Sequence, residues 1–278
     1  MSVIEVPARE VVRPLPAGPQ PDPVADIARV VRHEPLGAGN HRLVLHSARI
    51  AATALPGQFV MVTIPGFVLP RPMAIHRRRP HDGTIELIYK VAGAGTESLA
   101  LSAATSLELV GPLGRPFQLS SAQKNVLLLG RGIGVCAFMT VAEDIAARGG
   151  QATAVLSARS SAGLIGIDDA VELGVTAFTV TDEAASSDTA SVGRTVIDHF
   201  GADGPDGIMV CGSQRLARLA VELGRRWSAP VQVSLEAHMA CGLGYCHGCA
   251  LPCDGDSEGL LVCADGPVFA LERDGRSQ

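Results

Sequence analysis

The spacing of apolar residues changes once along the chain, near residue 121, and this change constrains the fold more than any other feature. Before it, short apolar runs such as RLVLH and TIELIYKV are broken by Gly and Pro, which is typical of a small antiparallel barrel or sandwich. After it, β-rich runs such as NVLLLG and ATAVLSA alternate with helical patterns, which indicates a parallel sheet covered by helices. The 278 residues agree with about two domains of roughly 150 residues each.

We therefore predict four segments. Residues 1–24 carry six prolines and are expected to be a disordered tail, because proline removes backbone donors. Residues 25–120 are expected to form the barrel, and residues 121–232 a doubly wound parallel-sheet domain that binds a nucleotide. Residues 233–278 are cysteine-dense and too short for a large core, so an inorganic group is expected to hold this small C-terminal domain together.

Charge and hydropathy exclude several classes of partner. The chain has 23 Lys+Arg against 28 Asp+Glu and no basic block, which argues against nucleic-acid binding. No stretch approaches the roughly 18 continuous apolar residues that span a bilayer. The N-terminus also lacks the basic and then apolar pattern of a signal peptide. We expect a cytoplasmic protein without a membrane partner.

A glycine-rich turn in NVLLLGRGIGVCAF lies where a buried strand is expected to lead into a helix. Read from Gly132 through Gly134 to Ala137, it fits G-x-G-x-x-A, in which missing side chains let backbone N–H groups approach a pyrophosphate. This context favours nucleotide binding over a merely structural turn. The acidic residue expected at the end of the next strand is absent, since ATAVLSARS offers Ser157 and Arg159. Arg159 is either a ligand for a 2′-phosphate or simply solvated, so NADH and NADPH both stay open.

A second candidate lies in GIMVCGSQRLA, where another apolar run ends in Cys211 and Gly212. Ligands of doubly wound sheets bind at the carboxyl ends of the strands, so we place both residues in the nucleotide crevice. A buried thiol that packs as a small hydrophobe is the alternative for Cys211 and the preferred interpretation for Cys136.

Five of the seven cysteines lie within 23 residues near the C-terminus. Cys241, Cys246 and Cys249 have C-x4-C-x2-C spacing and Cys263 follows after thirteen residues, which is typical of a plant-type [2Fe–2S] site. Zinc is the alternative metal, although its cysteines usually come as two short pairs.

Two further residues of this segment also have metal-binding side chains. Cys253 is an alternative fourth ligand, but its closeness to Cys249 favours a free thiol. His247 lies between two ligands and suggests a Rieske-type site, whereas four cysteines already suffice. We interpret His247 as solvated or hydrogen-bonded.

The two sites together require a third cofactor. A nicotinamide nucleotide delivers two electrons as hydride, whereas a [2Fe–2S] cluster accepts one at a time, so a flavin is needed between them. We place it in the barrel domain. The segments RPMAI, from Arg71, and YKVAGAGT, ending at Thr96, supply a guanidinium and a glycine turn suited to phosphates.

These motifs occur in an order that resembles the iron–sulfur electron-transfer subunit of type B dihydroorotate dehydrogenase, in the ferredoxin–NAD(P) reductase superfamily. RPMAI, IYK with GAGT, GPLGRPF, LLLGRGIGV, TDEA, VCGS and SLEAHMACGLGYCHGC follow one another between about residues 28 and 271. The resemblance implies that the cluster is held by the four spaced cysteines. It also implies that FAD contacts Arg71, Pro72, Met73, Ala74, Ile88, Tyr89, Lys90, Gly95 and Thr96.

Two residues depart from the family pattern. Ala74 stands where the family has a serine whose hydroxyl bonds the flavin ring, and Arg131 replaces a glycine of the nucleotide loop. Arg131 either adds a cation near the phosphates or blocks them.

The resemblance implies an oxidoreductase subunit in a hetero-oligomer with a catalytic FMN-containing flavoprotein of pyrimidine biosynthesis. Electrons would pass between that partner and NAD(H) through the cluster and FAD, with no acid–base side chain required. The alternatives are a reductase subunit of ferredoxin:NADP transhydrogenase, hydrogenase or sulfide dehydrogenase type, or a zinc-stabilised nucleotide-binding regulator.

Overall fold

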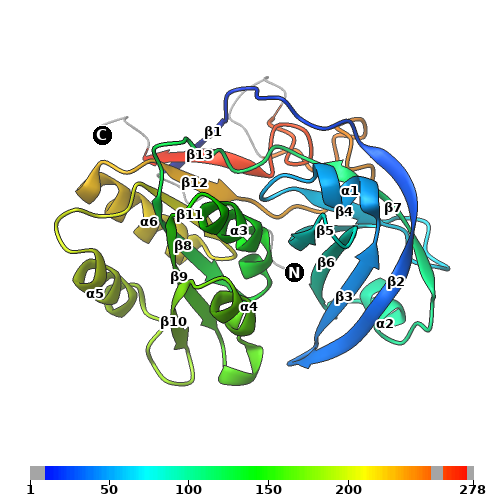
Figure 1. Ribbon diagram of the computed structural model, residues 1–278, viewed down its shortest axis with the longest axis horizontal. Helices are drawn as coiled ribbons and strands as arrows, with labels where there is room; N and C mark the ends of the chain where they lie inside the picture. Colours follow the sequence, from blue (N-terminus) through cyan, green and yellow to red (C-terminus); the bar gives the residue numbers. More distant parts are fainter. Residues whose placement is uncertain (1–9, 252–258, 274–278) are drawn as a thin grey trace.

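A computed structural model describes residues 10–251 and 259–273. It contains a closed barrel and a seven-stranded sheet, which lie side by side in Figure 1. This confirms the predicted combination of an antiparallel barrel and a doubly wound domain. Among the described residues, no helix combines the length and apolar character needed to cross a membrane.

The barrel is antiparallel and has the strand order β2-β3-β6-β5-β4-β7. Alternate residues of its strands point inward and bury a core that includes Leu43, Ile75 and Leu87. Two short helices accompany the strands. The elements are β2 (Val24–Gly37), β3 (Asn40–His46), α1 (Ala48–Thr53), β4 (Phe59–Val62), β5 (Arg71–Arg79), β6 (Thr84–Lys90), α2 (Ala94–Ala100) and β7 (Ser106–Leu113).

The sheet has the order β1-β13-β12-β11-β8-β9-β10. The strands from β12 to β10 are parallel to one another, and β13 is antiparallel to both of its neighbours, β12 and β1. The direction of strand succession reverses between β8 and β11, and ligands of such sheets bind at this point. The strands are β1 (Glu10–Pro14), β8 (Asn125–Arg131), β9 (Gln151–Ala158), β10 (Thr176–Thr181), β11 (Gly207–Cys211), β12 (Val231–Ser234) and β13 (Val268–Arg273).

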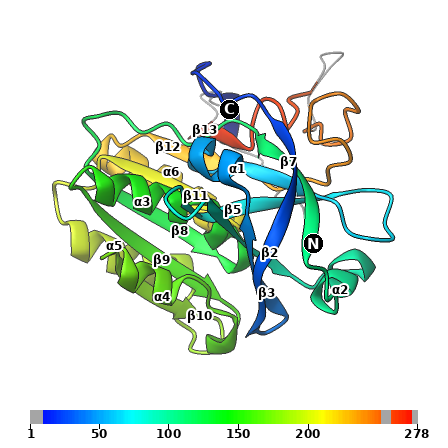
Figure 2. The ribbon, with the colours of Figure 1, turned by 45° about the vertical axis from the view of Figure 1, so that its right-hand side comes forward.

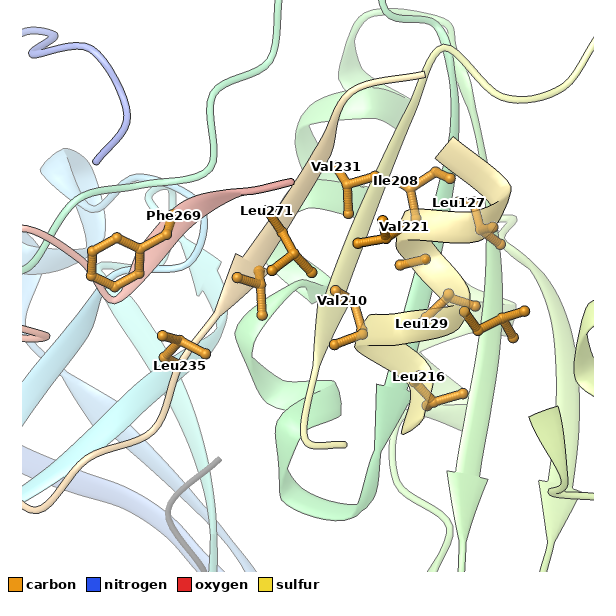
Figure 3. Packing of buried hydrophobic residues seen from close by; sticks show 14 of the residues in the cluster. Leu127, Leu129, Ile208, Val210, Leu216, Val221, Val231, Leu235, Phe269 and Leu271 are labelled. Atoms are coloured by element: carbon orange, nitrogen blue, oxygen red, sulfur yellow. The ribbon is translucent and has the colours of Figure 1, made fainter. Parts of the chain in front are cut away.

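Helices cover both faces of the sheet. Residues of β8 and β11 alternate between the two faces: Leu127 and Ile208 face α6, whereas Leu128 and Met209 lie in the cluster that contains α3 (Figure 3). Near-continuous burial of these strands follows from this double cover. The helices are η1 (Gly132–Ala137), α3 (Met139–Ala147), η2 (Ser161–Gly163), α4 (Ile167–Glu172), α5 (Thr189–Phe200) and α6 (Gln214–Trp227).

The N-terminal segment joins the edge of the sheet. The prediction of a disordered tail over residues 1–24 is wrong from Glu10 onward, because β1 pairs with β13 and the side chain of Leu15 is buried; residues 1–9 lie outside the described residues. Proline is compatible with this strand since β1 is an edge strand and Pro14 is its last residue.

The cysteine segment is an insertion between two strands of the sheet. Its chain leaves β12 and returns through β13, so the predicted boundary at residue 233 divides β12. Cys249 and Cys263 are buried in the same apolar cluster as Phe59 and Met61 of β4. The segment therefore packs against the barrel, and Figure 2 shows its loop beside β7.

A buried network of charges joins the barrel to the sheet domain. Asp169 of α4 lies 3.0 Å from Nε2 of His76 and accepts a hydrogen bond of 2.8 Å from Nη1 of Arg77, both on β5. Arg77 also donates to Glu143 of α3 at 2.5 Å and to Glu172 of α4 at 3.1 Å. Since both barrel side chains are nearly inaccessible, the two domains share a desolvated ionic junction.

The junction holds Asp169 in the ionised form, whereas burial raises the pKa of Glu143. Burial opposes ionisation of Asp169, but His76, Arg77 and Arg42 hold the pKa of this carboxyl well below its usual range. His76, Glu86 and Asp169 place ligand atoms within 4.8 Å of one another, as a metal site would. Each of the two carboxylates is already paired with a guanidinium, at 2.7 Å for Glu86 and Arg42, so we interpret the group as an ion-pair network.

We expect Asp169→Asn to lower the free energy of unfolding by about 3–5 kcal/mol, because it removes the buried carboxylate that Arg42, His76 and Arg77 share. Differential scanning calorimetry of the variant measures the loss as a lower melting temperature. Asp168→Asn is the matched control, since Asp168 is the exposed neighbour on the same helix. Equal melting temperatures for the two variants would contradict the role of the junction.

Candidate functional site

The two predicted glycine turns of the nucleotide domain meet at the switch point of the sheet. A Cβ atom on Gly134 would lie 2.6 Å from Cα of Gly212, so the two backbones are in contact only because both residues are glycine. Gly132 has a φ of +54°, and the space where its Cβ would lie is open. The structure thus brings Gly132, Gly134, Cys211 and Gly212 together, with an accessible surface at Gly132.

Two polar residues that the sequence analysis did not identify, Ser234 and Glu236, lie near Cys211 at the ends of the neighbouring strands. Ser234 of β12 is the register partner of Cys211 and its hydroxyl hydrogen-bonds that thiol. Burial and the nearby Glu236 raise the pKa of Cys211 well above its ordinary value, and burial also raises the pKa of Glu236. A neutral thiol and a carboxyl group with a raised pKa therefore lie at the carboxyl ends of β11 and β12.

The expected flavin residues of β5 and β6 lie on neighbouring strands but face two directions. Ala74 and Ile88 point out of the barrel and pack in the cluster that contains η1 and α3. Met73 and Tyr89 point into the barrel core, where the Tyr89 hydroxyl lies 2.7 Å from Nε2 of His33. The backbones of Met73 and Tyr89 can therefore line the outer face, whereas their side chains cannot.

The remaining expected flavin residues surround the start of α2. A Cβ atom on Gly95 would lie 2.6 Å from Nη2 of Arg71, so the guanidinium rests on this glycine. Arg71 donates to the Leu69 carbonyl at 2.7 Å and forms no ion pair with the described carboxylates. The Thr96 hydroxyl accepts from the Ala92 N–H at 2.9 Å. Pro72 pairs with Met61 of β4, and Lys90 is exposed at the end of β6.

The four spaced cysteines lie in two close pairs. The thiols of Cys249 and Cys263 are 3.2 Å apart, and the Cys246 side chain is hydrogen-bonded to the sulfur of Cys241. One loop joins the two pairs, since the N–H of Leu243 donates to Cys241 and the N–H of Gly244 donates to Cys263 at 3.1 Å. Glycine is required in this loop, where Gly242 and Gly244 have φ of +70° and +78°.

Backbone donors make one of these thiols acidic. Burial opposes ionisation of Cys241, but N–H groups of Leu243 and Cys246 lower its pKa to about 6. Burial and the neighbouring Cys249 raise the pKa of Cys263 to about 12. Repulsion between neighbouring thiolates raises the pKa of Cys263, and a bound cation would offset that repulsion. The four thiols are therefore suited to bind a metal centre as thiolates.

The predictions for Cys136, His247 and Cys253 are compared with the structure as follows. Cys136 is fully buried in η1, as expected of a packing residue. His247 is exposed with φ +57°. Cys253 lies outside the described residues.

One candidate site residue was missed because its strand is not the expected one. The end of β9 carries no acidic residue, yet Asp182, directly after β10, is held beside Ser157 through Arg131. Asp182 lies in the TDEA motif, but nothing in that motif places it beside Ser157, which is 25 positions earlier in the chain.

Comparisons with known proteins agree with this arrangement. The model of the iron–sulfur cluster binding domain of dihydroorotate dehydrogenase B matches residues 236–273, which include the four cysteines. The chain is 30% identical over 254 residues to the electron transfer subunit of dihydroorotate dehydrogenase B (NAD(+)) from Enterococcus faecalis, covering 88% of this chain and 95% of that one. It is 30% identical to the Bacillus cereus subunit, with 87% and 95% covered.

The chain belongs to the family of dihydroorotate dehydrogenase B electron transfer subunits. A solved NADH-dependent reduced ferredoxin-NADP oxidoreductase is similar in structure, with a TM-score of 0.75, 27% identity and 88% of each chain covered. A ferredoxin reductase of carbazole 1,9a-dioxygenase shares the fold, with a TM-score of 0.64, 17% identity and 77% and 70% of the two chains covered. The comparisons support FAD, a [2Fe–2S] cluster and NAD, which agrees with the predicted FAD, [2Fe–2S] cluster and NAD(P)(H).

Proposed function

We propose that this chain passes electrons between NAD(H) and a catalytic partner subunit through FAD and a [2Fe–2S] cluster. The observation that carries the proposal is the grouping of the four thiols as two pairs around one loop, in a segment that packs against the barrel. When bound, FAD exchanges a hydride with the nicotinamide and single electrons with the cluster.

We assign the cluster to Cys241, Cys246, Cys249 and Cys263. Their spacing and the N–H groups that donate to their sulfurs support this assignment over zinc, and so does the match of this segment to an iron–sulfur domain. The N–H donors stabilise the thiolate form of the ligands, and the buried positions of Cys249 and Cys263 limit access of water.

We assign the flavin to the outer face of β5 and β6. Ala74 offers a partly exposed apolar surface for the ring with the buried Ile88 beside it, and Arg71 offers a guanidinium without a carboxylate partner among the described residues. We assign the nicotinamide nucleotide to the neighbouring switch point of the sheet. The open backbone at Gly132 would hold the pyrophosphate there, and Cys211 with Gly212 would face the nicotinamide. The chain's residues bind and orient the cofactors, and none needs to act as an acid or base.

The partner we infer is an FMN-containing flavoprotein that oxidises dihydroorotate, in a hetero-oligomer of the cytoplasm. The names of the relatives support this partner, because they are electron transfer subunits of dihydroorotate dehydrogenase B (NAD(+)). Four free thiols as metal ligands suit a reducing compartment.

A second candidate is a reductase subunit of another oxidoreductase. The similarity to a solved NADH-dependent reduced ferredoxin-NADP oxidoreductase favours this candidate over a zinc-stabilised regulator. The alignment covers 88% of this chain and 88% of that chain.

Purification of the untagged native complex tests the choice between them. We expect a dihydroorotate-oxidising FMN protein to copurify and the complex to reduce NAD+ with dihydroorotate, followed at 340 nm. Recovery with a different oxidoreductase, without dihydroorotate oxidation, would favour the second candidate. A colourless preparation that contains zinc would refute both.

We expect Cys246→Ser to abolish the iron–sulfur absorbance and electron transfer to the partner, while NADH-dependent reduction of a dye through FAD stays within about twofold. The reason is that Cys246 is exposed and that the proposed flavin residues lie on β5 and β6, whereas the cysteine segment packs against β4. Iron, sulfide and FAD analyses measure these effects. Cys136→Ala is the control, since Cys136 lies outside the cluster segment and should retain its iron. Full iron content in Cys246→Ser would contradict the assignment.

We expect Gly95→Ala to reduce bound FAD at least tenfold, because the new methyl group would displace the Arg71 guanidinium that rests on this glycine. Gly93→Ala is the matched control, as nothing lies within 4 Å of its Cβ position. The measurement is the amount of FAD retained after gel filtration. Equal retention in the two variants would contradict the assignment of Arg71 to the flavin site.

A further inference from the structure

An ion pair spans the carboxyl ends of three neighbouring strands. Arg131, the last residue of β8, donates from Nη2 to Oδ2 of Asp182 at 2.6 Å and from Nη1 to Oδ1 at 3.2 Å. The same Nη1 donates to the Ser157 hydroxyl at 2.9 Å and lies 3.4 Å from the Ala158 carbonyl, both on β9. The Ser187 hydroxyl also donates to Asp182. Arg131 therefore reaches from its own strand across the end of β9 to the end of β10.

This position coincides with a defined part of a bound dinucleotide. In doubly wound sheets the pyrophosphate lies on the loop after the first strand, and the adenosine ribose lies at the end of the next strand, where an acidic residue accepts a bond from its 2′-hydroxyl. Here these strands are β8 and β9. The end of β9 lacks the acid, and Asp182 supplies a carboxylate beside the same place.

We propose that Asp182, held by Arg131, is the acceptor for the ribose 2′-hydroxyl and makes the site selective for NAD(H) over NADP(H). This inference rests on the proposed function and names the residues that set the choice of nucleotide at its site. It also assigns a role to Arg131, which neither adds a free cation for the phosphates nor blocks them but positions the carboxylate.

The charges around the pair support selectivity for the hydroxyl. Hydrogen bonds from Arg131 and Ser187 lower the pKa of Asp182 to about 2, so it is an anion at neutral pH. A 2′-phosphate would bring about two more negative charges against that carboxylate. Arg131 is occupied by both carboxylate oxygens, and it would have to release them to bind a phosphate. A hydroxyl, in contrast, donates to the exposed lone pairs of Asp182 without disturbing the pair.

Two other arginines lie near Asp182 and are alternative ligands for a 2′-phosphate. Nη2 of Arg215 is 3.9 Å from Oδ1 of Asp182, so this cation also faces the carboxylate. Arg159 is exposed and has no ion pair among the described residues. If Arg159 instead recruited a 2′-phosphate, the protein would prefer NADPH, which the experiment below detects.

The test compares Asp182→Asn with Glu183→Gln in the FAD-loaded protein. Glu183 is the exposed neighbour, so its variant removes the same charge one residue further along. The measurement is kcat/KM for NADH and for NADPH with a dye acceptor. We expect the wild type to prefer NADH, and Asp182→Asn to lower the NADH to NADPH ratio about tenfold to a hundredfold, through loss of a charge-assisted hydrogen bond and of repulsion. Glu183→Gln should keep the ratio within about twofold.

A second variant separates the two members of the pair. Arg131→Gln leaves the carboxylate in place, so we expect the preference for NADH to persist with a higher KM. A selective loss of NADPH turnover in this variant would instead mean that Arg131 binds the 2′-phosphate, and the proposal would be overturned. A wild type that prefers NADPH, or an unchanged ratio in Asp182→Asn, would also overturn it.

Binding of fragments gives a readout that needs no turnover. Isothermal titration calorimetry with ADP-ribose and with its 2′-phosphorylated form should show tighter binding of the former by the wild type, and near-equal binding by Asp182→Asn. Failure of both nucleotides to reduce FAD would refute the proposed function, whereas normal turnover with an unchanged ratio would refute only this inference. Melting temperature and FAD content establish that each variant is folded.

Discussion

A buried ionic contact between β5 of the barrel and helices α3 and α4 fixes the two domains relative to each other. Arg77 is almost inaccessible and meets three carboxylates, so separating the domains would expose or strand charges that are costly to leave unpaired. The outer face of β5 that carries Ala74 lies a few residues before this contact on the same strand. The junction therefore also sets how the expected flavin surface meets the nucleotide loop, which electron transfer between bound cofactors requires.

The cysteine segment depends on the same assembly from its other side. It begins after β12 and ends at β13, so both of its ends are anchored in the sheet. Its buried thiols pack against Phe59 and Met61, and the Arg115 side chain, which follows β7, donates to the Ala264 carbonyl at 3.2 Å. The N-terminal strand then covers β13. A single sheet thus holds the nucleotide loop on one strand and the cluster loop between two others.

Sequence patterns located most of the cofactor-binding candidates because each of those signals is local. The cysteine spacing, the glycine turns after β8 and β11, and the alternation that separates barrel from sheet are all visible within a few neighbouring residues. The same patterns failed for the N-terminal strand, since its prolines predicted a tail and its pairing partner lies more than 250 residues away. They also did not predict that Met73 and Tyr89 point into the barrel while Ala74 and Ile88 point out. The direction of each side chain depends on how the strands pair when the barrel closes.

The sequence by itself determined the class of chemistry: four thiolates in an iron–sulfur spacing, glycines where backbone must approach a phosphate, and a barrel followed by a doubly wound sheet. Only the tertiary structure decided which distant charged residues pair with one another. It brought Asp182 from β10 to the end of β9, and Asp169 of α4 against His76 and Arg77 of β5. Such contacts join charged groups from separate strands and helices, and the free energy of pairing them exists only once folding has excluded water around them.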